Sequence, residues 1–459
     1  MNIADQAVDK PFSRPATGAA AEVSERDCDV LVIGGGPAGS TVATLLAERG
    51  HRVTLLEKDH HPRFHIGESL LPANLQLFDK LGVGDEMRAI GIEKHAAEFV
   101  SPDHDCTQTF RFADAWDKSM PYAYQVRRSE FDHILLRNAA RKGAEVIEGC
   151  KVKDVEFHAD GASVAAERED GRRERWQARF VIDASGRDTF LANRMRAKHR
   201  NPHHNSSALY GHFANAKRHC GSAEGNISIY WFEHGWFWFI PLADGATSVG
   251  AVTWPYYMKR RNGRSLDAFL LDTIALCPPL AERLGEARLV SDVHATGNFS
   301  YTTDHTHGDH YLLLGDAYAF IDPVFSSGVM LAMQGAFYGA EAVDTCLRKP
   351  AQKRAALARF DKAARHGPRQ FSWFIYRMTN PTMRDLFMGP RNPLRVKDAL
   401  ISLLAGDIYG KTPIWASLAV FKLIYYTAAL RHLPRTLAAL RRRRRNIRPV
   451  EDQEMASHA

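Results

Sequence analysis

Cysteine is scarce in this sequence, and its spacing suggests neither metal binding nor disulfide bonding. Six cysteines occur among 459 residues, and no two of them form a CxxC pair. We therefore expect free thiols in a reducing compartment and no bound metal. Residues 1–26 lack an apolar run, which argues against a secretory signal peptide and predicts a disordered tail. These absences together predict a cytoplasmic protein.

The excess of positive charge is small for a chain of this length. The formal net charge is +7, and much of the surplus lies near the C-terminus. Zinc-finger spacings and aromatic-basic RNA motifs are missing, so nucleic acid is not an expected partner. Hydrophobic residues make up 45% and charged residues 25%, which is enough apolar material for a large core. The length predicts two or three packed units.

A strand, a glycine turn and a helix open the ordered part of the chain. Residues 29–33 form an apolar run typical of a buried parallel strand, a helical pattern covers 40–49, and 53–57 is the next expected strand. Beyond them we expect a helix over 131–142, strands over 146–155, 163–167, 180–183 and 311–314, an antiparallel sheet over 205–255, and a helix from about Ser327.

These elements predict an α/β protein with a Rossmann-like dinucleotide-binding domain, an inserted antiparallel β-sheet domain and a mostly helical C-terminal region. The expected boundaries are the tail over 1–26, a discontinuous dinucleotide-binding domain over 27–95, 125–200 and 290–350, a substrate-side sheet domain over 96–124 and 201–289, and a helical region with a basic tail over 351–459.

The segment from Gly34 to Gly39 has the G-x-G-x-x-G spacing between the first strand and the first helix. Gly34 permits the tight turn, Gly36 lets the backbone approach a pyrophosphate, and Gly39 allows close packing of the helix. The helix N-terminus adds N–H donors and a positive dipole end. Glu57, at the end of the next strand, can accept from ribose hydroxyls and disfavours the extra phosphate of NADP. We interpret the segment as a nucleotide site rather than a ligand-free turn.

Two later segments favour FAD over NAD: Phe180–Gly186, a strand running into a turn, and Gly315-Asp316, at a strand end before a helix. With them the chain resembles, over about residues 28–350, the large family that holds FAD in the manner of aromatic hydroxylases, halogenases and geranylgeranyl reductases. The resemblance implies that Asp316 contacts the ribitol of the flavin and that Arg128 approaches the phosphates. Arg63 is a further candidate, with a solvated surface charge as its alternative. The expected cofactor-binding residues are Gly34, Gly36, Pro37, Ala38, Gly39, Glu57, Lys58, Arg63, Arg128, Asp316 and Gly328.

Two tryptophans narrow the range of reactions that the protein is expected to catalyse. The segment from Trp236 to Pro241 follows the pattern W-x-W-x-I-P, and residues two apart on a strand share one face. In an arbitrary protein this would be a core aromatic stripe. Here it resembles the signature of flavin-dependent halogenases, and the resemblance implies that Trp236 and Trp238 obstruct direct access of an organic substrate to the flavin.

A second segment, from Phe320 to Gly328, follows the pattern F-x-x-P-x-x-S-x-G and also resembles the halogenase pattern. A turn of small residues that opens a helix presents backbone N–H groups to an anion. We therefore expect a chloride or bromide ion at Ser327 and Gly328. The alternative is an ordinary helix start that contacts the flavin, which related hydroxylases share.

Lys94 is the expected catalytic lysine. It follows the Gly67-Glu-Ser69 segment in a stretch that resembles the halogenases acting on phenols and pyrroles. The alternative is an exposed lysine without a role, and the following His95-Ala-Ala departs from the small or glycine-containing run common in that family. A lysine normally titrates near about 10.4, so an ammonium donor is the default and burial would favour a haloamine. Both forms stay open.

The resemblance implies that reduced FAD, oxygen and a halide give hypohalous acid, which reaches Lys94 and then halogenates an electron-rich aromatic. A second G-x-G-x-x-G is missing, so a separate flavin reductase is the expected source of reduced FAD. The substrate is expected to be a small phenol or pyrrole, free or on an acyl carrier protein. A geranylgeranyl-type reductase, a hydroxylase and a non-catalytic flavoprotein at a membrane surface are the alternatives.

The C-terminal segment allows two interpretations. Residues 413–430 are apolar and aromatic with Lys422 inside, and five arginines follow at 441–445. One interpretation is a helix packed on the FAD-binding domain that ends in a solvated basic tail. The other is an interfacial helix whose arginines meet anionic lipid at the inner face of the membrane or an acidic carrier protein.

Overall fold

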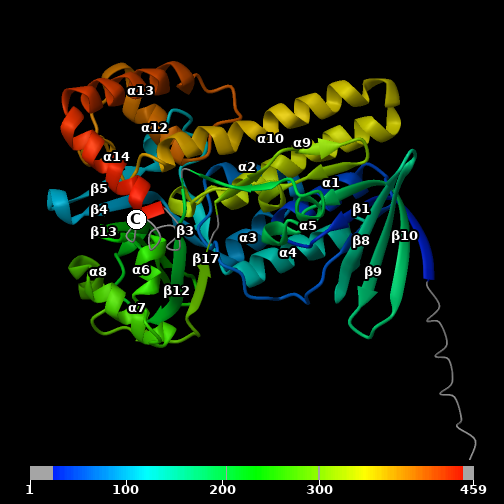
Figure 1. Ribbon diagram of the computed structural model, residues 1–459, viewed down its shortest axis with the longest axis horizontal. Coiled ribbons are helices and arrows are strands. Elements are labelled where there is room, and N and C mark those ends of the chain that lie inside the picture. The colour runs from blue at the N-terminus through cyan, green and yellow to red at the C-terminus, as the bar shows by residue number, and fades with distance from the viewer. Residues whose placement is uncertain (1–23, 203, 298–299, 448–459) are drawn as a thin grey trace, which may run out of the picture.

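The computed structural model describes residues 24–202, 204–297 and 300–447, and Figure 1 shows their arrangement. Most of the tail expected over 1–26 lies outside these residues. For residues 24–26 the expected tail is wrong: they belong to strand β1 (Ser24–Ile33), because residues 24–28 pair in parallel with residues 174–178.

A mostly parallel sheet forms the first layer. Its strands follow the order β19-β20-β10-β1-β2-β7, and the antiparallel β9 and β8 extend it from β10. These strands are β2 (Val53–Leu56), β7 (Glu145–Ile147), β8 (Cys150–His158), β9 (Gly161–Arg168), β10 (Arg173–Asp183), β19 (His307–Gly308) and β20 (Tyr311–Leu313). The single strand expected over 146–155 is wrong, because Gly149 at φ 63° turns the chain between β7 and β8.

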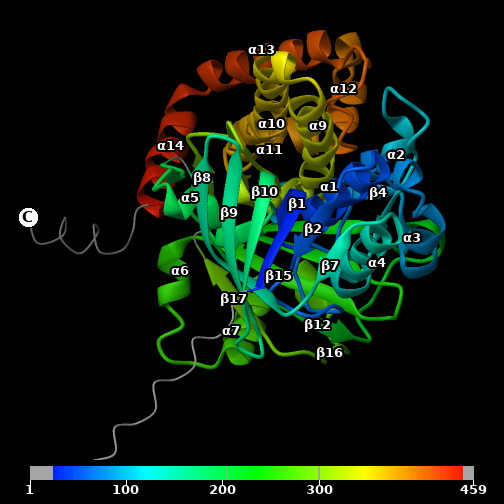
Figure 2. The ribbon, with the colours of Figure 1, turned by 90° about the vertical axis from the view of Figure 1, so that its right-hand side faces the viewer.

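Both faces of this sheet are buried, which explains the continuous apolar run of β1. Val30 and Val32 face a core shared with α1 (Pro37–Glu48), α4 (Arg128–Arg141) and α9 (Gly328–Arg348). Leu31 and Ile33 face the opposite core, which β8 and β9 complete. Helix α1 packs against both α4 and α9, and Figure 2 shows α1 and α9 on the same side of the sheet. The expected βαβ start is therefore confirmed.

A second, largely antiparallel sheet lies beside the first (Figure 1). Its order is β16-β12-β15-β14-β13-β4-β5, with β17 also paired to β12. Its members are β4 (Ala96–Ser101), β5 (Cys106–Arg111), β12 (Ser207–Ala214), β13 (Ile227–Phe232), β14 (Gly235–Pro241), β15 (Thr247–Thr253), β16 (Arg288–Leu289) and β17 (His294–Gly297). The antiparallel sheet expected over 205–255 is thus confirmed, and residues 96–111 join it through the parallel pairing of β4 with β13.

Further short elements lie outside these two sheets. They are β3 (Ile92–Lys94), β6 (Ala123–Gln125), β11 (Lys198–Arg200), β18 (Tyr301–Thr303), β21 (Ala319–Phe320), α2 (Ala73–Leu81), α3 (Gly84–Ile90), α5 (Phe190–Arg194), α6 (Pro255–Lys259), α7 (Leu266–Ala275) and α8 (Pro278–Arg283).

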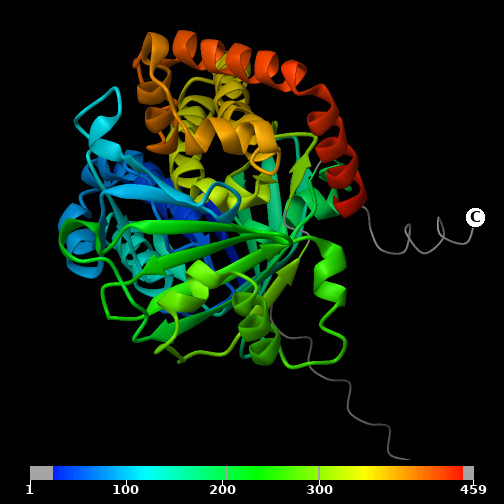
Figure 3. The same cartoon turned by 90° about the vertical axis from the view of Figure 1, so that its left-hand side faces the viewer.

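The C-terminal region is helical, as expected, and comprises α10 (Lys353–Ile375), α11 (Pro381–Met388), α12 (Val396–Leu404), α13 (Ile414–Arg431) and α14 (Leu433–Ile447). The expectation that residues 413–430 pack on the FAD-binding domain is wrong. Helix α13 packs on the other C-terminal helices, because Phe421 and Tyr425 meet Trp373 and Phe374 of α10. The arginine run also lies in a helix, α14, and not in a tail (Figure 3). Within the described residues, every helix is too short or too polar to cross a bilayer.

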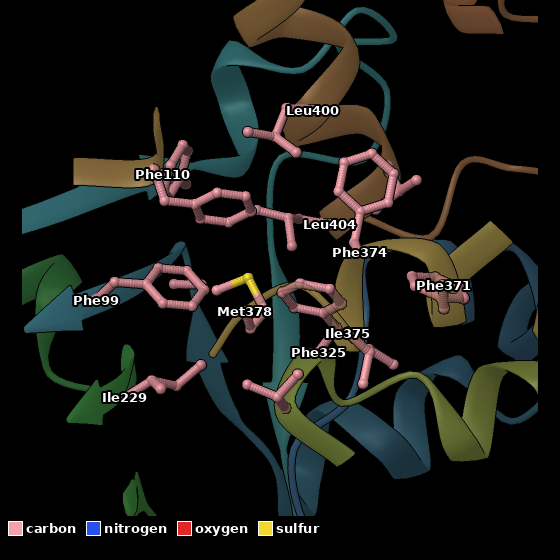
Figure 4. Packing of buried hydrophobic residues seen from close by; sticks show 14 of the residues in the cluster. Phe99, Phe110, Ile229, Phe325, Phe371, Phe374, Ile375, Met378, Leu400 and Leu404 are labelled. Carbon is pink, nitrogen blue, oxygen red and sulfur yellow. The ribbon is translucent and has the colours of Figure 1, made fainter. Parts of the chain in front are cut away.

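One core joins the C-terminal helices to the second sheet. Figure 4 shows Phe99 and Phe110 of the sheet in the same cluster as Phe374 of α10 and Leu404 of α12. Phe325, from the turn before α9, lies in the same core. This packing places that turn between the two sheets and the helical region.

Candidate active site

A cavity of about 440 Å³ lies where the glycine turn of the first sheet meets β14 of the second. Twelve of the residues singled out in the sequence line it: Gly34, Gly36, Pro37, Ala38, Glu57, Lys58, Arg63, Arg128, Trp236, Trp238, Asp316 and Gly328. Three others, Gly39, Ser327 and Lys94, are not part of its wall. Residues that are far apart in the sequence therefore line the same cavity.

The glycines of the turn are needed for different structural reasons. Gly34 has φ 99°, and a Cβ there would lie 2.5 Å from the carbonyl oxygen of Ala184. A Cβ on Gly39 would lie 1.9 Å from the Gly34 oxygen, which explains why this residue packs the helix but does not line the cavity. At Gly36 a Cβ would meet only the tip of Arg63, at 4.0 Å. Protein packing thus leaves the space beside Gly36 open, as a bound pyrophosphate requires.

Glu57 holds the glycine turn and faces the cavity at the same time. Its carboxylate accepts hydrogen bonds from the Gly35 amide at 2.6 Å and the Asp59 amide at 2.9 Å. A carboxylate has about four acceptor sites, so two remain for ribose hydroxyls. The side chain is 3% exposed, which fixes its orientation before any ligand arrives.

Two arginines share one buried aspartate at the cavity wall. Arg128 binds Asp132 through two hydrogen bonds of 2.8 and 2.9 Å, and Arg63 lies 3.6 Å from the same carboxylate. Arg63 also lies 3.9 Å from Glu57, and its side chain is 20% exposed. The alternative that Arg63 is a freely solvated surface charge is therefore wrong. Two guanidiniums that face the cavity suit a pyrophosphate.

Asp316 and Arg187 both line the cavity. Burial raises the pKa of Asp316 to about 6, and the charges of Arg128 and Arg187 act in the opposite direction. Arg187 escaped the sequence analysis, although it directly follows the recognised segment Phe180–Gly186. Its position one residue beyond a turn that meets the nucleotide site was the available signal. Lys58 lines the cavity but also pairs with Asp188 at 2.5 Å.

Trp236 and Trp238 lie on the cavity face of β14, as their spacing requires. Their ring centroids are 6.1 Å apart, and both side chains are more than nine-tenths buried. Trp238 donates to Ser248 Oγ at 3.1 Å, and Gly250 opposite leaves room for its ring. The pair therefore forms a rigid aromatic wall facing the cofactor residues.

The turn from Asp322 to Gly328 forms a further part of the wall, through Pro323, Ser326 and Gly328. Helix α9 begins at Gly328, as expected within one residue. Ser327 is 1% exposed, and its Oγ is buried without a hydrogen-bond partner. The first amides of a helix likewise lack partners within the helix, so this corner offers donors to a small anion.

Lys94 is enclosed directly behind the cavity wall. Its Nζ donates to Ser69 Oγ at 3.0 Å and to the Leu70 carbonyl oxygen, and the Phe112 ring lies 5.3 Å away. The side chain is 1% exposed, and burial lowers its pKa to about 7. The alternative of an exposed lysine is therefore wrong. Ser69 lines the cavity, so a residue of the cavity wall accepts a hydrogen bond from Lys94.

The donors and the open space along this cavity fit an FAD. Gly36 leaves room for the cofactor to approach the backbone. Arg63 and Arg128 supply positive charge. Glu57 and Asp316 supply hydrogen-bond acceptors. The family model described as an FAD binding domain matches residues 27–370, so the site is that of an FAD-dependent enzyme.

Comparison with known proteins narrows this class. The chain is 36% identical over 357 residues to the flavin-dependent halogenase armH3 of Armillaria mellea. This match covers 72% of this chain and 70% of that protein. It is 29% identical over 416 residues to the 1H-pyrrole-2-carbonyl-[peptidyl-carrier protein] chlorinase of Pseudomonas fluorescens, covering 84% and 91%. The solved structure of the myxobacterial chondrochloren halogenase CndH superposes with a TM-score of 0.74 at 35% identity, covering 85% and 93%. The chain belongs to the flavin-dependent halogenases.

Proposed function

We propose that this enzyme halogenates an electron-rich aromatic of the phenol or pyrrole type through hypohalous acid and Lys94. Bound reduced FAD supplies the oxygen-activating chemistry that converts a halide to hypohalous acid. One observation carries the proposal: Trp236 and Trp238 share a cavity with the FAD-binding residues, and Lys94 lies one hydrogen bond behind that cavity's wall. In this proposal the substrate reaches Lys94, and the tryptophans separate the substrate from the flavin.

The halide binds at the turn before α9 in this proposal. The amides of Ser327 and Gly328, the unpartnered Ser327 hydroxyl and the N-terminal end of a 21-residue helix are all suited to a small anion. Ser326 and Gly328 face the cavity that would hold the flavin. These hydrogen-bond donors suit chloride and bromide equally.

Lys94 acts after the oxygen-dependent step. Hypohalous acid leaves the cavity past Ser69 and meets the lysine, whose Nζ is already oriented by Ser69 and Leu70. A lysine with a pKa near 7 is about half amine at neutral pH. The amine is the form that attacks the halogen of hypohalous acid, so that the nitrogen–halogen bond forms as the oxygen–halogen bond breaks and water leaves. The buried environment therefore favours the haloamine over a hydrogen-bonded hypohalous acid.

A separate flavin reductase supplies reduced FAD in this proposal, and the substrate is free or tethered to a carrier protein. The pyrrole chlorinase relative supports the tethered form, since its name gives a carrier-bound substrate. The test is mass spectrometry of products formed with a flavin reductase and bromide, using a panel of phenols and pyrroles, free and carrier-bound. Absence of any brominated product across the panel, with oxygen still consumed, would contradict this substrate class.

The pH dependence of coupling distinguishes the two roles left open for Lys94. We expect the product formed per oxygen consumed to rise as the pH increases through about 7, because deprotonation of Lys94 generates the amine. A hydrogen-bonding ammonium predicts the opposite slope. The ratio is measured between pH 5.5 and 8 at saturating halide. A ratio that falls over this range removes the haloamine.

The tryptophan wall can be opened without touching the nucleotide turn. We expect Trp236→Phe or Trp238→Phe to lower the product formed per oxygen consumed several-fold, because a smaller ring leaves a gap in the wall, with FAD affinity unchanged. Trp176→Phe is the matched control, since Trp176 is 1% exposed in β10 and is not part of the cavity wall. Parental coupling in both wall variants would reduce the tryptophans to ordinary core residues.

A further inference from the structure

A buried polar cluster joins helix α14 to the turn from Asp322 to Gly328. His204 Nε2 lies 2.8 Å from Asp322 Oδ2, and Ser206 Oγ lies 3.2 Å from the same nitrogen. Arg443 Nη2 approaches the other ring nitrogen, Nδ1, at 3.3 Å. His204 and Asp322 are 6% and 2% exposed, so water does not compete for the contact between them, and Arg443 is half-buried. The arginine run thus reaches the same turn that lines the cofactor cavity.

The chemistry of arginine fixes the direction of these hydrogen bonds. A guanidinium can only donate, so His204 Nδ1 accepts from Arg443. The ring proton therefore resides on Nε2, which donates to Asp322. Burial lowers the pKa of Arg443 to about 10, which leaves it charged at neutral pH. One neutral imidazole then connects a buried carboxylate to a positive charge from a distant helix.

Asp322 transmits this contact to the backbone of the turn. Its second oxygen, Oδ1, accepts from the Val324 amide at 3.2 Å and caps the short 3₁₀ helix Pro323–Phe325. That helix ends at Ser326 with φ 56°, a left-handed conformation that few residues other than glycine adopt. Such a conformation persists only where its surroundings determine it from several sides.

A second anchor holds the turn from the opposite side. Phe325 stacks on Phe387 of α11 with centroids 6.3 Å apart, inside the core shown in Figure 4. Phe325 fixes the apolar side of the turn, and Asp322 fixes its polar side. Arg443 and His204 hold Asp322, and the ring of Tyr376, 5.7 Å from that of His204, packs over the cluster.

We propose that Arg443 is a positioning residue that acts through His204 and Asp322 to hold the turn 322–328 in the conformation facing the cofactor cavity. The positioning role rests on the contacts described above. Only its expected effect on halide binding rests on the proposed halide site. It assigns a specific role to one arginine of the run, and exposed neighbours such as Arg444 provide matched controls.

Hydrogen exchange, followed by mass spectrometry, measures the positioning directly. In Arg443→Gln we expect amides of residues 322–328 to exchange about 10-fold faster or more, because a charged, partly buried hydrogen bond is lost. Arg444→Gln should exchange like the parent, and Arg443→Lys should recover part of the protection, since an ammonium also donates. His204→Gln should match Arg443→Gln, and the double variant should add little because both residues act through one connection. Unchanged exchange in Arg443→Gln overturns the proposal.

Halide kinetics test the consequence separately. We expect Arg443→Gln to raise the KM for bromide about 10-fold with kcat within about 2-fold, since a loosened turn weakens anion binding more than chemistry. The affinity for FAD, measured by flavin fluorescence, should stay at the parental value. Faster exchange with an unchanged bromide KM would uphold the positioning role of Arg443 and contradict the halide assignment. Unchanged exchange with a raised bromide KM would overturn the positioning role.

Discussion

Replacement of Lys94 by alanine is expected to abolish halogenation while leaving flavin chemistry intact. The variant should bind FAD and consume oxygen with reduced flavin at the parental rate, because Lys94 is not part of the cofactor cavity. Product formation should fall about 100-fold or more, the scale at which a positioned proton-transfer or nucleophilic group contributes. The two half-reactions separate because the lysine acts on a diffusing intermediate. Oxygen electrode traces and product mass spectrometry on the same samples measure both.

Two further variants sharpen this experiment. Lys94→Arg should fail as well, because a guanidinium stays protonated and its planar fork does not match the Ser69 and Leu70 acceptors. Lys118→Ala, at an exposed lysine, is the matched control and should behave like the parent. Full halogenation by Lys94→Ala, with free hypohalous acid scavenged, would remove Lys94 from the mechanism. Activity of Lys94→Arg would leave only the hydrogen-bonding role.

Replacement of Gly36 by valine should weaken FAD binding about 10- to 100-fold, because the branched side chain fills the space that the pyrophosphate needs and such overpacking costs about 1–3 kcal/mol. The apoprotein should keep its thermal stability, since a Cβ at Gly36 meets only the tip of Arg63 at 4.0 Å. Flavin titration measures the affinity for FAD, and thermal unfolding of the apoprotein measures its stability.

Gly39→Ala provides the contrast. A Cβ there would lie 1.9 Å from the Gly34 oxygen, so this variant should lose stability even without a ligand. If Gly36→Val retains parental FAD affinity, the pyrophosphate lies elsewhere. If it unfolds the apoprotein, the position serves packing and not the cofactor.

The sequence predicts the nucleotide site well because its determinants are local. A strand, a glycine turn, a helix and Glu57 occupy about thirty consecutive positions, and each residue has a role that follows from backbone geometry. The shared face of Trp236 and Trp238 is likewise set by the two-residue period of a strand. These placements hold in the structure without any knowledge of distant contacts.

Other features depend on contacts between distant segments, which spacing does not encode. The enclosure of Lys94 requires Ser69 and Phe112, and the tertiary environment alone lowers its pKa. The arginine run looked like a solvated tail because charge normally indicates exposure, yet Arg443 meets His204. Arg187 directly follows a recognised segment, which marks it as a candidate, but its place on the cavity wall depends on the fold.

The strand order of the first sheet has a consequence for synthesis of the protein. In β1, Val30 pairs with Phe180 of β10, and the neighbouring Val181 pairs with Tyr311 of β20. The first sheet is therefore incomplete until β20, which ends at Leu313, has left the ribosome, and its pairings have high contact order. Until then residues 181–183 of β10 lack their neighbouring strand β20, and an unpaired apolar strand edge favours aggregation. Slow translation or a lower expression temperature should raise the yield of flavin-loaded protein.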